Sequence, residues 1–161
     1  MASWRLPVNI YTLLFLISGK INIPLKNGKD FQHQIELSVS STLKVDESLG
    51  SSESYKLTIQ SPSTITIVGS DRAGVFYGIQ SLLNLVEGES TFPGCEIEDQ
   101  PRYEYRGMHL DVSRNFHSKA QVLKLLDVMA MYKMNKFHFH LTDDEGWRLE
   151  IPGLEELTQV C

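Results

Sequence analysis

Cysteine is scarce in this sequence, which has two cysteines among its 161 residues. Cys95 and Cys161 are far apart, and neither belongs to a C-x-x-C pair of the kind that binds zinc or carries out thiol redox chemistry. Two cysteines cannot build the disulfide framework of a small secreted scaffold. We therefore expect the fold to depend on a hydrophobic core, and a structural disulfide is disfavoured.

Clusters of basic residues are also absent. The chain has 15 Lys and Arg against 20 Asp and Glu, a net charge of −5, with both signs mixed along its length. Proteins that bind nucleic acids present a basic patch, so a nucleic acid is not expected as the partner. Hydrophobic residues at 42% and charged residues at 22% are typical of a globular protein. Such a chain can bury a core and bind neutral ligands such as sugars.

Long apolar runs are missing, and the longest candidate, Val8–Ile17, is shorter than the ~20 residues that span a bilayer. We therefore expect no stable membrane insertion. This run follows Arg5 and precedes small residues, which is the outline of a signal peptide and indicates a secreted or lysosomal protein. The alternative for residues 1–20 is a first β-strand, because large side chains recur at every second position from Tyr11 to Phe15. The sequence has no N-x-Ser/Thr sequon, so a glycosylation site lends no support to secretion.

Residues 21–90 show the pattern of a small α/β domain. Apolar residues at alternate positions predict strands around residues 35–39, 55–59 and 65–67. The last two strands are separated by Ser61-Pro62-Ser63, a turn signal that predicts a hairpin. We expect these strands to form an antiparallel sheet.

The apolar period changes after residue 71 and predicts one helix over residues 72–86. Asp71 is a candidate N-cap and Gly88 a candidate terminator. The residues that share the apolar face are Val75, Ile79, Leu82, Leu83 and Val86. We expect this helix to cover one face of the sheet. Residues 91–101, with Pro93, Gly94, Pro101 and several acids, are predicted to be a linker.

Residues 102–161 begin with a strand–helix–strand pattern. Strands are predicted at Tyr105–Asp111 and Lys136–Thr142, and the helix between them begins at a capping box formed by Ser118 and Gln121. This order predicts a βαβ unit with parallel strands. In parallel α/β folds, ligands bind at the carboxyl ends of the strands, so the polar residues that follow each strand are the candidate site.

Arg114 follows the first of these strands. Its guanidinium could donate a planar fork to two neighbouring sugar hydroxyls, or it could form an ion pair with Asp111 or Asp143 that locks the loop. Asp143 and Asp144 follow the second strand. Adjacent carboxylates on a strand diverge, so we favour structural or orienting roles for them over direct catalysis.

His138 and His140 share one face of the second strand. With Asp143 they resemble part of a zinc site. A closed metal set would need ligands from later strands, however, so hydrogen-bonded histidines in a sheet layer are favoured and no metal is predicted. Trp147 could stack on a sugar ring or simply pack the loop, and packing is favoured.

Two segments, RGMHLDVSRNF and NKFHFHLTDDEGWRLEI, together resemble the start of the catalytic barrel of glycoside hydrolase family 20, the β-N-acetylhexosaminidases. The resemblance extends from about Pro101 to Leu157. Residues 21–90 resemble the small α/β domain that precedes the barrel in this family, chiefly through the GVFYGIQSLLNL helix. The resemblance implies a (β/α)₈ barrel that removes terminal N-acetylhexosamine from glycans or chito-oligosaccharides, and it implies no cofactor.

The resemblance also implies roles for individual residues. Arg114 would bind hydroxyls of the terminal sugar, and Asp143 would belong to a hydrogen-bond network that orients a histidine of a later strand. His140 and Trp147 would shape the pocket. The mechanism of the family is substrate-assisted, with the 2-acetamido carbonyl of the substrate attacking the anomeric carbon.

The catalytic Asp-Glu pair of that family, in an H-x-G-G-D-E segment, has no counterpart in this sequence. The Asp-Glu steps are Asp46-Glu47 and Asp144-Glu145, and neither follows two glycines. The segment after residue 101 is also far shorter than the about 250 residues of a complete barrel. We therefore expect an inactive fragment, with no catalytic residue in the chain. The alternatives are a non-catalytic carbohydrate-binding or interaction protein and a metal-dependent hydrolase that uses His138, His140 and Asp143. Oligomeric state is not predicted.

Overall fold

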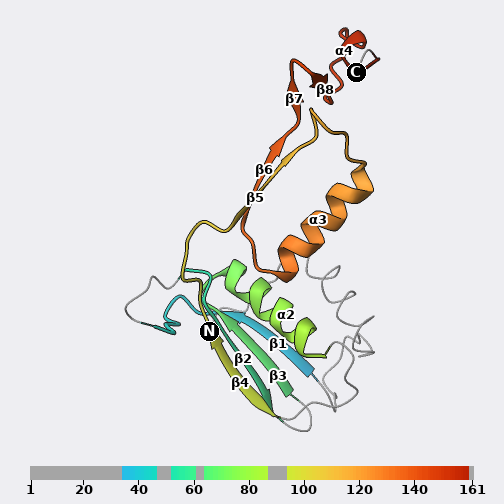
Figure 1. Cartoon of the computed structure of the whole chain (residues 1–161). Coiled ribbons are helices and arrows are strands. Elements are labelled where there is room, and N and C mark those ends of the chain that lie inside the picture. Colours follow the sequence, from blue (N-terminus) through green and yellow to red (C-terminus); the bar gives the residue numbers. More distant parts are fainter. Residues whose placement is uncertain (1–33, 47–51, 61–63, 87–93, 160–161) are drawn as a thin grey trace. The chain divides into compact units, whose positions relative to one another are not determined.

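A computed structural model describes residues 34–46, 52–60, 64–86 and 94–159 (Figure 1). The chain divides into two compact units, Met1–Arg102 and Tyr103–Cys161. The predicted signal peptide or first strand over residues 1–20 lies outside the described residues, as does Cys161. Within the described ranges, every helix is too short or too polar to span a bilayer.

The first unit contains a four-stranded sheet in the order β1-β3-β2-β4. Its strands are β1 (Gln34–Val39), β2 (Tyr55–Gln60), β3 (Thr64–Gly69) and β4 (Cys95–Asp99). β2 and β3 pair antiparallel, which confirms the predicted hairpin, and β4 pairs antiparallel with the other edge of β2. β1 instead pairs parallel with β3. The sheet is therefore mixed, and the prediction of an antiparallel sheet was wrong for β1.

β1 does not pair with the strand that follows it in the sequence. β1 and β2 follow each other in the sequence but are not neighbours, because β3 lies between them. β3 runs antiparallel to β2 on one side and parallel to β1 on the other. Alternation of apolar residues has the same period in either strand direction, so the sequence pattern could not reveal this order.

β4 lies within the segment predicted as a linker, which was wrong over the length of this strand. Cys95 and Ile97 pack against the hydrophobic core. Glu96 and Glu98 alternate with them, and their carboxylates lie 2.7 and 2.9 Å from the Lys56 ammonium on β2. The strand has only two apolar residues, and acidic residues alternate with them. The nearby prolines and glycine favoured a linker, so the strand pattern was not recognised.

Helix α2 (Arg72–Val86) packs on the sheet and completes the core of the first unit. Its bounds match the predicted helix. Asp71 acts as the N-cap, because its Oδ1 accepts the Gly74 N–H at 2.8 Å. The proposed terminator Gly88 lies outside the described residues. The most deeply buried hydrophobic side chains are Tyr55, Leu57, Ile67, Ile79 and Leu82.

The second unit begins with a strand, a helix and a strand. These are β5 (Gly107–Asp111), α3 (Lys119–Met131) and β6 (Lys136–His140). β5 and β6 pair parallel, as the βαβ prediction requires. Ser118 caps α3, and the capping box with Gln121 is present in both directions. The short hairpin of β7 (Thr142–Asp143) and β8 (Gly146–Trp147) follows, and then helix α4 (Glu156–Gln159).

Few hydrophobic side chains of the second unit are buried. Among its described residues, Val112 and Met129 are buried, while Met108, Leu126 and Phe139 are each more than a third exposed. Two strands and one helix do not provide a second layer that could cover these apolar side chains. The first unit therefore has a closed core of its own, and the second unit has a much smaller one.

A Gly74→Ala substitution is expected to destabilise the first unit, although alanine normally favours a helix. A Cβ atom at this position would collide with the backbone carbonyl oxygen of Ser54, which cannot rotate away. Overpacking costs about 1–3 kcal/mol, more than the roughly 1 kcal/mol gained by replacing glycine in a helix. Urea unfolding measures the change in the free energy of unfolding. Asn84→Ala, at an exposed position of α2, is the control and should be neutral or slightly stabilising. An equal gain for both variants would contradict the close contact.

Candidate functional site

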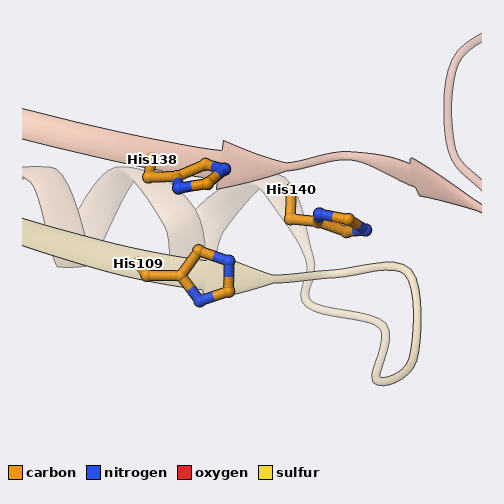
Figure 2. A group of neighbouring side chains, drawn as sticks. All are labelled: His109, His138 and His140. Carbon is orange, nitrogen blue, oxygen red and sulfur yellow. The ribbon is translucent and has the colours of Figure 1, made fainter.

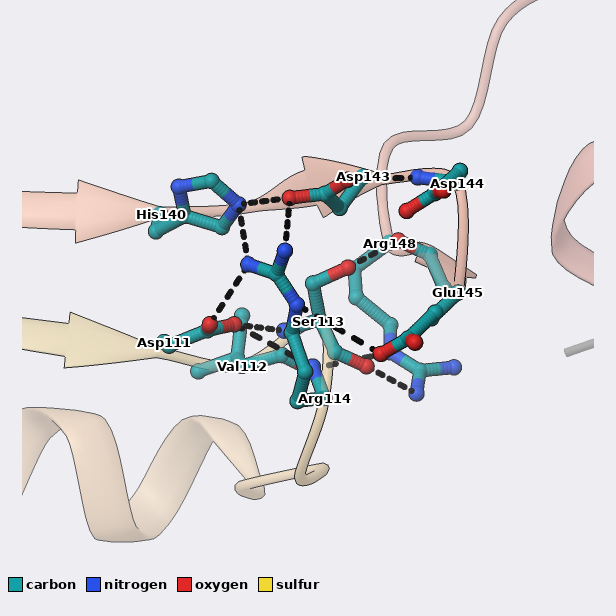
Figure 3. A network of polar contacts seen from close by, with 10 residues as sticks. Asp111, Val112, Ser113, Arg114, His140, Asp143, Asp144, Glu145 and Arg148 are labelled. Atoms are coloured by element: carbon teal, nitrogen blue, oxygen red, sulfur yellow. Dashed lines mark hydrogen bonds and ion pairs between the residues drawn. The ribbon is translucent and has the colours of Figure 1, made fainter.

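Polar side chains gather where β5 and β6 end (Figure 3). The parallel register places Asp111 opposite His140, the last residue of each strand. The Val112 N–H donates to the His140 carbonyl at 3.1 Å and extends this pairing. β7 follows β6 and brings Asp143 to the same edge. This is the edge at which parallel α/β folds bind ligands.

Asp111 organises the loop that follows β5. Its Oδ1 accepts the backbone N–H groups of Ser113 at 2.9 Å and Arg114 at 3.1 Å, and its Oδ2 accepts from Arg114 Nη1 at 2.8 Å. Burial alone would raise the pKa of Asp111, but the backbone N–H and the guanidinium of Arg114 outweigh it and lower the pKa. The ionised form of Asp111 therefore holds the loop.

The Arg114 guanidinium lies between carboxylates that come from both strand ends. Nη1 is 2.8 Å from Asp111 Oδ2, Nη2 is 2.7 Å from Asp143 Oδ2, and Nε is 3.6 Å from Glu145 Oε2. The hydrogen bond to Asp111 is the main reason why the pKa of Arg114 is raised. Of the two roles considered for Arg114, the ion pair is thus present. The side chain is still 47% exposed, so the guanidinium remains accessible to a ligand.

His140 contacts both members of this ion pair. Its Nε2 lies 2.8 Å from Asp143 Oδ2 and 3.2 Å from Arg114 Nη1. A carboxylate only accepts hydrogen bonds and a guanidinium only donates them, so Nε2 can satisfy one of these neighbours. The shorter contact favours a hydrogen on Nε2 that is donated to Asp143. In the neutral ring, Nδ1 then carries the lone pair.

The two adjacent carboxyl groups have different environments. The pKa of Asp143 is lowered to about 2, first by hydrogen bonding from the Asp144 side chain, then by the Asp144 backbone N–H and His140. The same side-chain hydrogen bond and the charge of Asp143 raise the pKa of Asp144. Asp143 therefore stays ionised while Asp144 is the more easily protonated. This asymmetry could not be predicted from the Asp-Asp pair alone.

Three residues that sequence reasoning missed hold the β7–β8 hairpin to the loop after β5. The buried Ser113 hydroxyl donates to the Gly146 carbonyl. Arg148 donates from Nε to the Val112 carbonyl and from Nη2 to the Ser113 carbonyl, each at 3.1 Å. A Cβ atom at Gly146 would collide with the Ser113 carbonyl oxygen, so this position needs glycine. Gly146 and Arg148 flank Trp147 in the sequence, but the sequence pattern did not reveal their partners in the loop after β5.

Trp147 lies on β8 beside this clamp, and none of its recorded contacts joins the Arg114 network. Its indole Nε1 donates to the Leu149 carbonyl at 2.8 Å, and the side chain is partly buried. The structure brings the side chains of Arg114, His140 and Asp143 together, and Trp147 lies opposite Thr142 in the β7–β8 hairpin. The packing role of Trp147 and its role at a sugar pocket both stay predictions.

Three histidines lie side by side on β5 and β6 (Figure 2). His109 pairs with His138 across the parallel register, and their ring centroids are 4.6 Å apart. The ring centroids of His109 and His140 are 6.2 Å apart. His138 and His140 share a strand face as predicted. His109 was missed, because its partner across the sheet depends on register.

The carboxyl groups of Asp143 and Asp144 are expected to titrate in separate pH ranges. The pKa of Asp143 is below its ordinary value of 3.8, so its stabilising contribution is present above pH 3.8 and is lost as the pH falls through about 2. Asp144, with a raised pKa, should protonate at higher pH. Carboxyl ¹³C NMR measures both titrations. Asp143→Asn should return the pKa of Asp144 toward 3.8, and two overlapping titrations near pH 3.8 in the unmodified chain would contradict the assignment.

Curated proteins similar to this chain carry glycosidase names. Over 123 residues it is 63% identical to "Beta-hexosaminidase" of Vibrio vulnificus, covering 76% of this chain and 14% of that protein. Over 114 residues it is 54% identical to "N,N'-diacetylchitobiase" of Vibrio harveyi, covering 70% of this chain and 13% of that protein. The chain thus spans about one seventh of the length of these relatives.

Solved structures show the same fold. An exo β-N-acetylglucosaminidase from Vibrio harveyi in complex with N-acetylglucosamine superposes with a TM-score of 0.72 and 37% identity, covering 94% of this chain and 23% of that one. A chitobiase from Flavobacterium johnsoniae superposes with a TM-score of 0.70 and 32% identity, covering 92% and 24%. These matches confirm the α/β fold class.

Two family profiles divide the chain between them. Residues 18–100 match "Glycosyl hydrolase family 20, domain 2", and residues 103–161 match "Glycosyl hydrolase family 20, catalytic domain". The two matches meet where the compact units divide, at Arg102. The sequence resemblance, the paired profiles and the shared fold lead to one conclusion: this chain belongs to glycosyl hydrolase family 20.

Proposed function

We propose that this chain forms part of a β-N-acetylhexosaminidase and supplies one wall of the pocket that binds a terminal N-acetylhexosamine. The whole enzyme would remove non-reducing terminal residues from glycans or chito-oligosaccharides by the substrate-assisted retaining mechanism. The observation that carries the proposal is the Arg114 guanidinium, held by Asp111 and Asp143 at the carboxyl edge of β5 and β6. The names of the similar proteins support it.

The charges around Arg114 favour a neutral ligand rich in hydroxyl groups. Asp111, Asp143 and Glu145 surround a single guanidinium, so carboxylates outnumber the cation in this group. A phosphate or carboxylate ligand would meet excess negative charge. A sugar hydroxyl can accept from the guanidinium and donate to a carboxylate at the same time. The group therefore fits a carbohydrate better than an anion.

The ion pairs of Arg114 orient its guanidinium for binding and leave some of its N–H donors available to a ligand. The contacts with Asp111 and Asp143 take one hydrogen each from Nη1 and Nη2, out of the five N–H donors of a guanidinium. The two carboxylates fix the plane of the group before a ligand arrives. A planar fork of fixed direction can reach two adjacent hydroxyls of one sugar ring. Locking and binding are thus compatible roles.

Other residues of the wall have supporting roles in this proposal. Asp143, which stays ionised, would accept a hydrogen bond from a histidine of a later strand and orient it. His140 would limit the pocket beside Arg114, and Trp147 would shape its rim. The clamp of Ser113, Gly146 and Arg148 would keep the hairpin that carries Asp143 in place.

Hydrolysis itself needs two carboxyl groups that these 161 residues do not supply in the family's H-x-G-G-D-E context. One would protonate the leaving oxygen and the other would orient the acetamido group. We infer that the chain alone binds sugar weakly and does not hydrolyse it.

The division of the chain follows the same proposal. Residues 1–20 would be a signal peptide or first strand, residues 21–90 the small domain, and residues 102–161 the start of the barrel. A signal peptide would direct the protein to secretion or to a lysosome.

Replacement of Arg114 by lysine is expected to weaken sugar binding. NMR titration of the 161-residue chain with N-acetylglucosamine should show shifts of the Arg114 and His140 signals. Arg114→Lys should raise the dissociation constant about tenfold or more, because an ammonium cannot reproduce the planar fork and a hydrogen bond to a charged group contributes about 1.5–3 kcal/mol. Lys124→Arg, at an exposed position of α3, is the control and should bind as the unmodified chain does. Equal affinity for all three proteins would contradict the role of Arg114.

The chain is expected to release no p-nitrophenol from p-nitrophenyl N-acetyl-β-glucosaminide above the rate of a buffer blank. Release would place a competent acid within these residues and would exclude a purely carbohydrate-binding protein.

Determination of the coding sequence beyond codon 161 separates the remaining possibilities. An in-frame H-x-G-G-D-E segment would support an active enzyme, and a stop codon would favour the binding or interaction protein.

A further inference from the structure

We propose that His109, His138 and His140 bind a divalent transition-metal ion of the zinc type. One imidazole nitrogen from each residue lies within 4.8 Å of the other two (Figure 2). Imidazole is a ligand that suits zinc, copper and nickel, whereas calcium and magnesium prefer oxygen. Three neighbouring imidazoles therefore select the transition metals.

Two hydrogen-bonded strands position the three ligands. His109 and His138 are register partners in the parallel ladder, and His140 follows His138 by two residues on the same strand face. Edge-to-face ring contacts hold His109 against both of the others. Ligands on paired strands have fixed backbone positions, so little ordering is left for the metal to impose.

The distances suit metal binding after small side-chain rotations. Zinc–nitrogen bonds of about 2.0–2.1 Å place tetrahedral ligand atoms about 3.4 Å apart. The three nitrogens, which lie within 4.8 Å of one another, must therefore approach by up to about 1.4 Å. The rings of His109 and His138 are exposed and can rotate, while the partly buried His140 provides the fixed point. Water would complete the coordination.

Asp143 is positioned to orient one of the three histidine ligands, as carboxylates near metal sites do. It accepts a hydrogen bond from His140 Nε2 at 2.8 Å, which leaves Nδ1 to bind the metal. In Figure 2, one nitrogen of His140 is directed toward His138 and the other away from it. A carboxylate that orients a histidine in this way fixes its tautomer and raises its affinity for metal.

The Arg114 guanidinium lies next to His140, at the ring nitrogen that also contacts Asp143. Its Nη1 is 3.2 Å from Nε2, the nitrogen that Asp143 occupies. Asp111 and Asp143 offset the guanidinium charge at the same edge. The sequence argument against a metal required ligands from later strands, whereas the third ligand comes from β5, earlier in the chain.

Calorimetric titration of the tag-free, chelator-treated chain with Zn²⁺ tests this proposal without any sugar present. Binding of one Zn²⁺ per chain is expected. His109→Gln, His138→Gln and His140→Gln should each weaken binding at least about tenfold, and Asp143→Asn by about 10- to 100-fold. His117→Gln, in the loop before α3, and Asp127→Asn, at an exposed position of α3, are the matched controls and should leave the affinity for Zn²⁺ within about twofold.

Two further measurements test whether the variants are folded and whether a cysteine thiolate coordinates the metal. ¹H–¹⁵N spectra should show that each variant keeps its fold, and Co²⁺ bound to the chain should show no thiolate charge-transfer absorption. Absence of saturable Zn²⁺ binding would overturn the proposal. So would binding that none of the three glutamine variants weakens, or a Co²⁺–thiolate band that Cys95→Ser removes. Because no sugar is used, failure of the sugar-binding proposal would leave this result unaffected.

Discussion

The ion pair of Arg114 with Asp111 and Asp143 joins the end of β5 to the segment that follows β6, and the candidate site depends on it. Asp111 and His140 are opposite each other only because the strands are parallel and in this register. Asp143 then faces Arg114 because the β7–β8 hairpin is clamped to the loop after β5 by Ser113 and Arg148. A single guanidinium thus gathers carboxylates from two strand ends, and their mutual repulsion is offset by its charge.

His140 links two features of the same surface. Its Nε2 belongs to the Arg114–Asp143 group, and its other nitrogen is directed toward His138. Occupation of the histidine site would favour the same tautomer that Asp143 favours, so a metal and the ionised Asp143 should support each other. The Arg114–Asp143 group and the three histidines therefore share one imidazole ring, that of His140.

The two units differ in how fully they are packed. The first has a mixed sheet, a capped helix and a hydrophobic core. Its almost completely buried aliphatic side chains are Leu57, Ile67, Ile79 and Leu82. The second depends more on polar contacts, since Arg148, Ser113 and Asp111 form hydrogen bonds with backbone groups at the strand ends. Loops held by hydrogen bonds at a strand edge are well suited to ligand binding, because their polar groups are already oriented.

Local patterns in the sequence determined much of this protein. The helix after Asp71, the capping box at Ser118, the β2–β3 hairpin and the family itself were all predictable, because capping, periodicity and motifs act over a few residues. The tertiary structure alone decided the parallel pairing of β1, the strand β4, the clamp formed by Gly146 and Arg148, and the neighbours of His109. Each of these depends on which strands become neighbours and in what register, and alternation along one strand carries no information about the strand beside it.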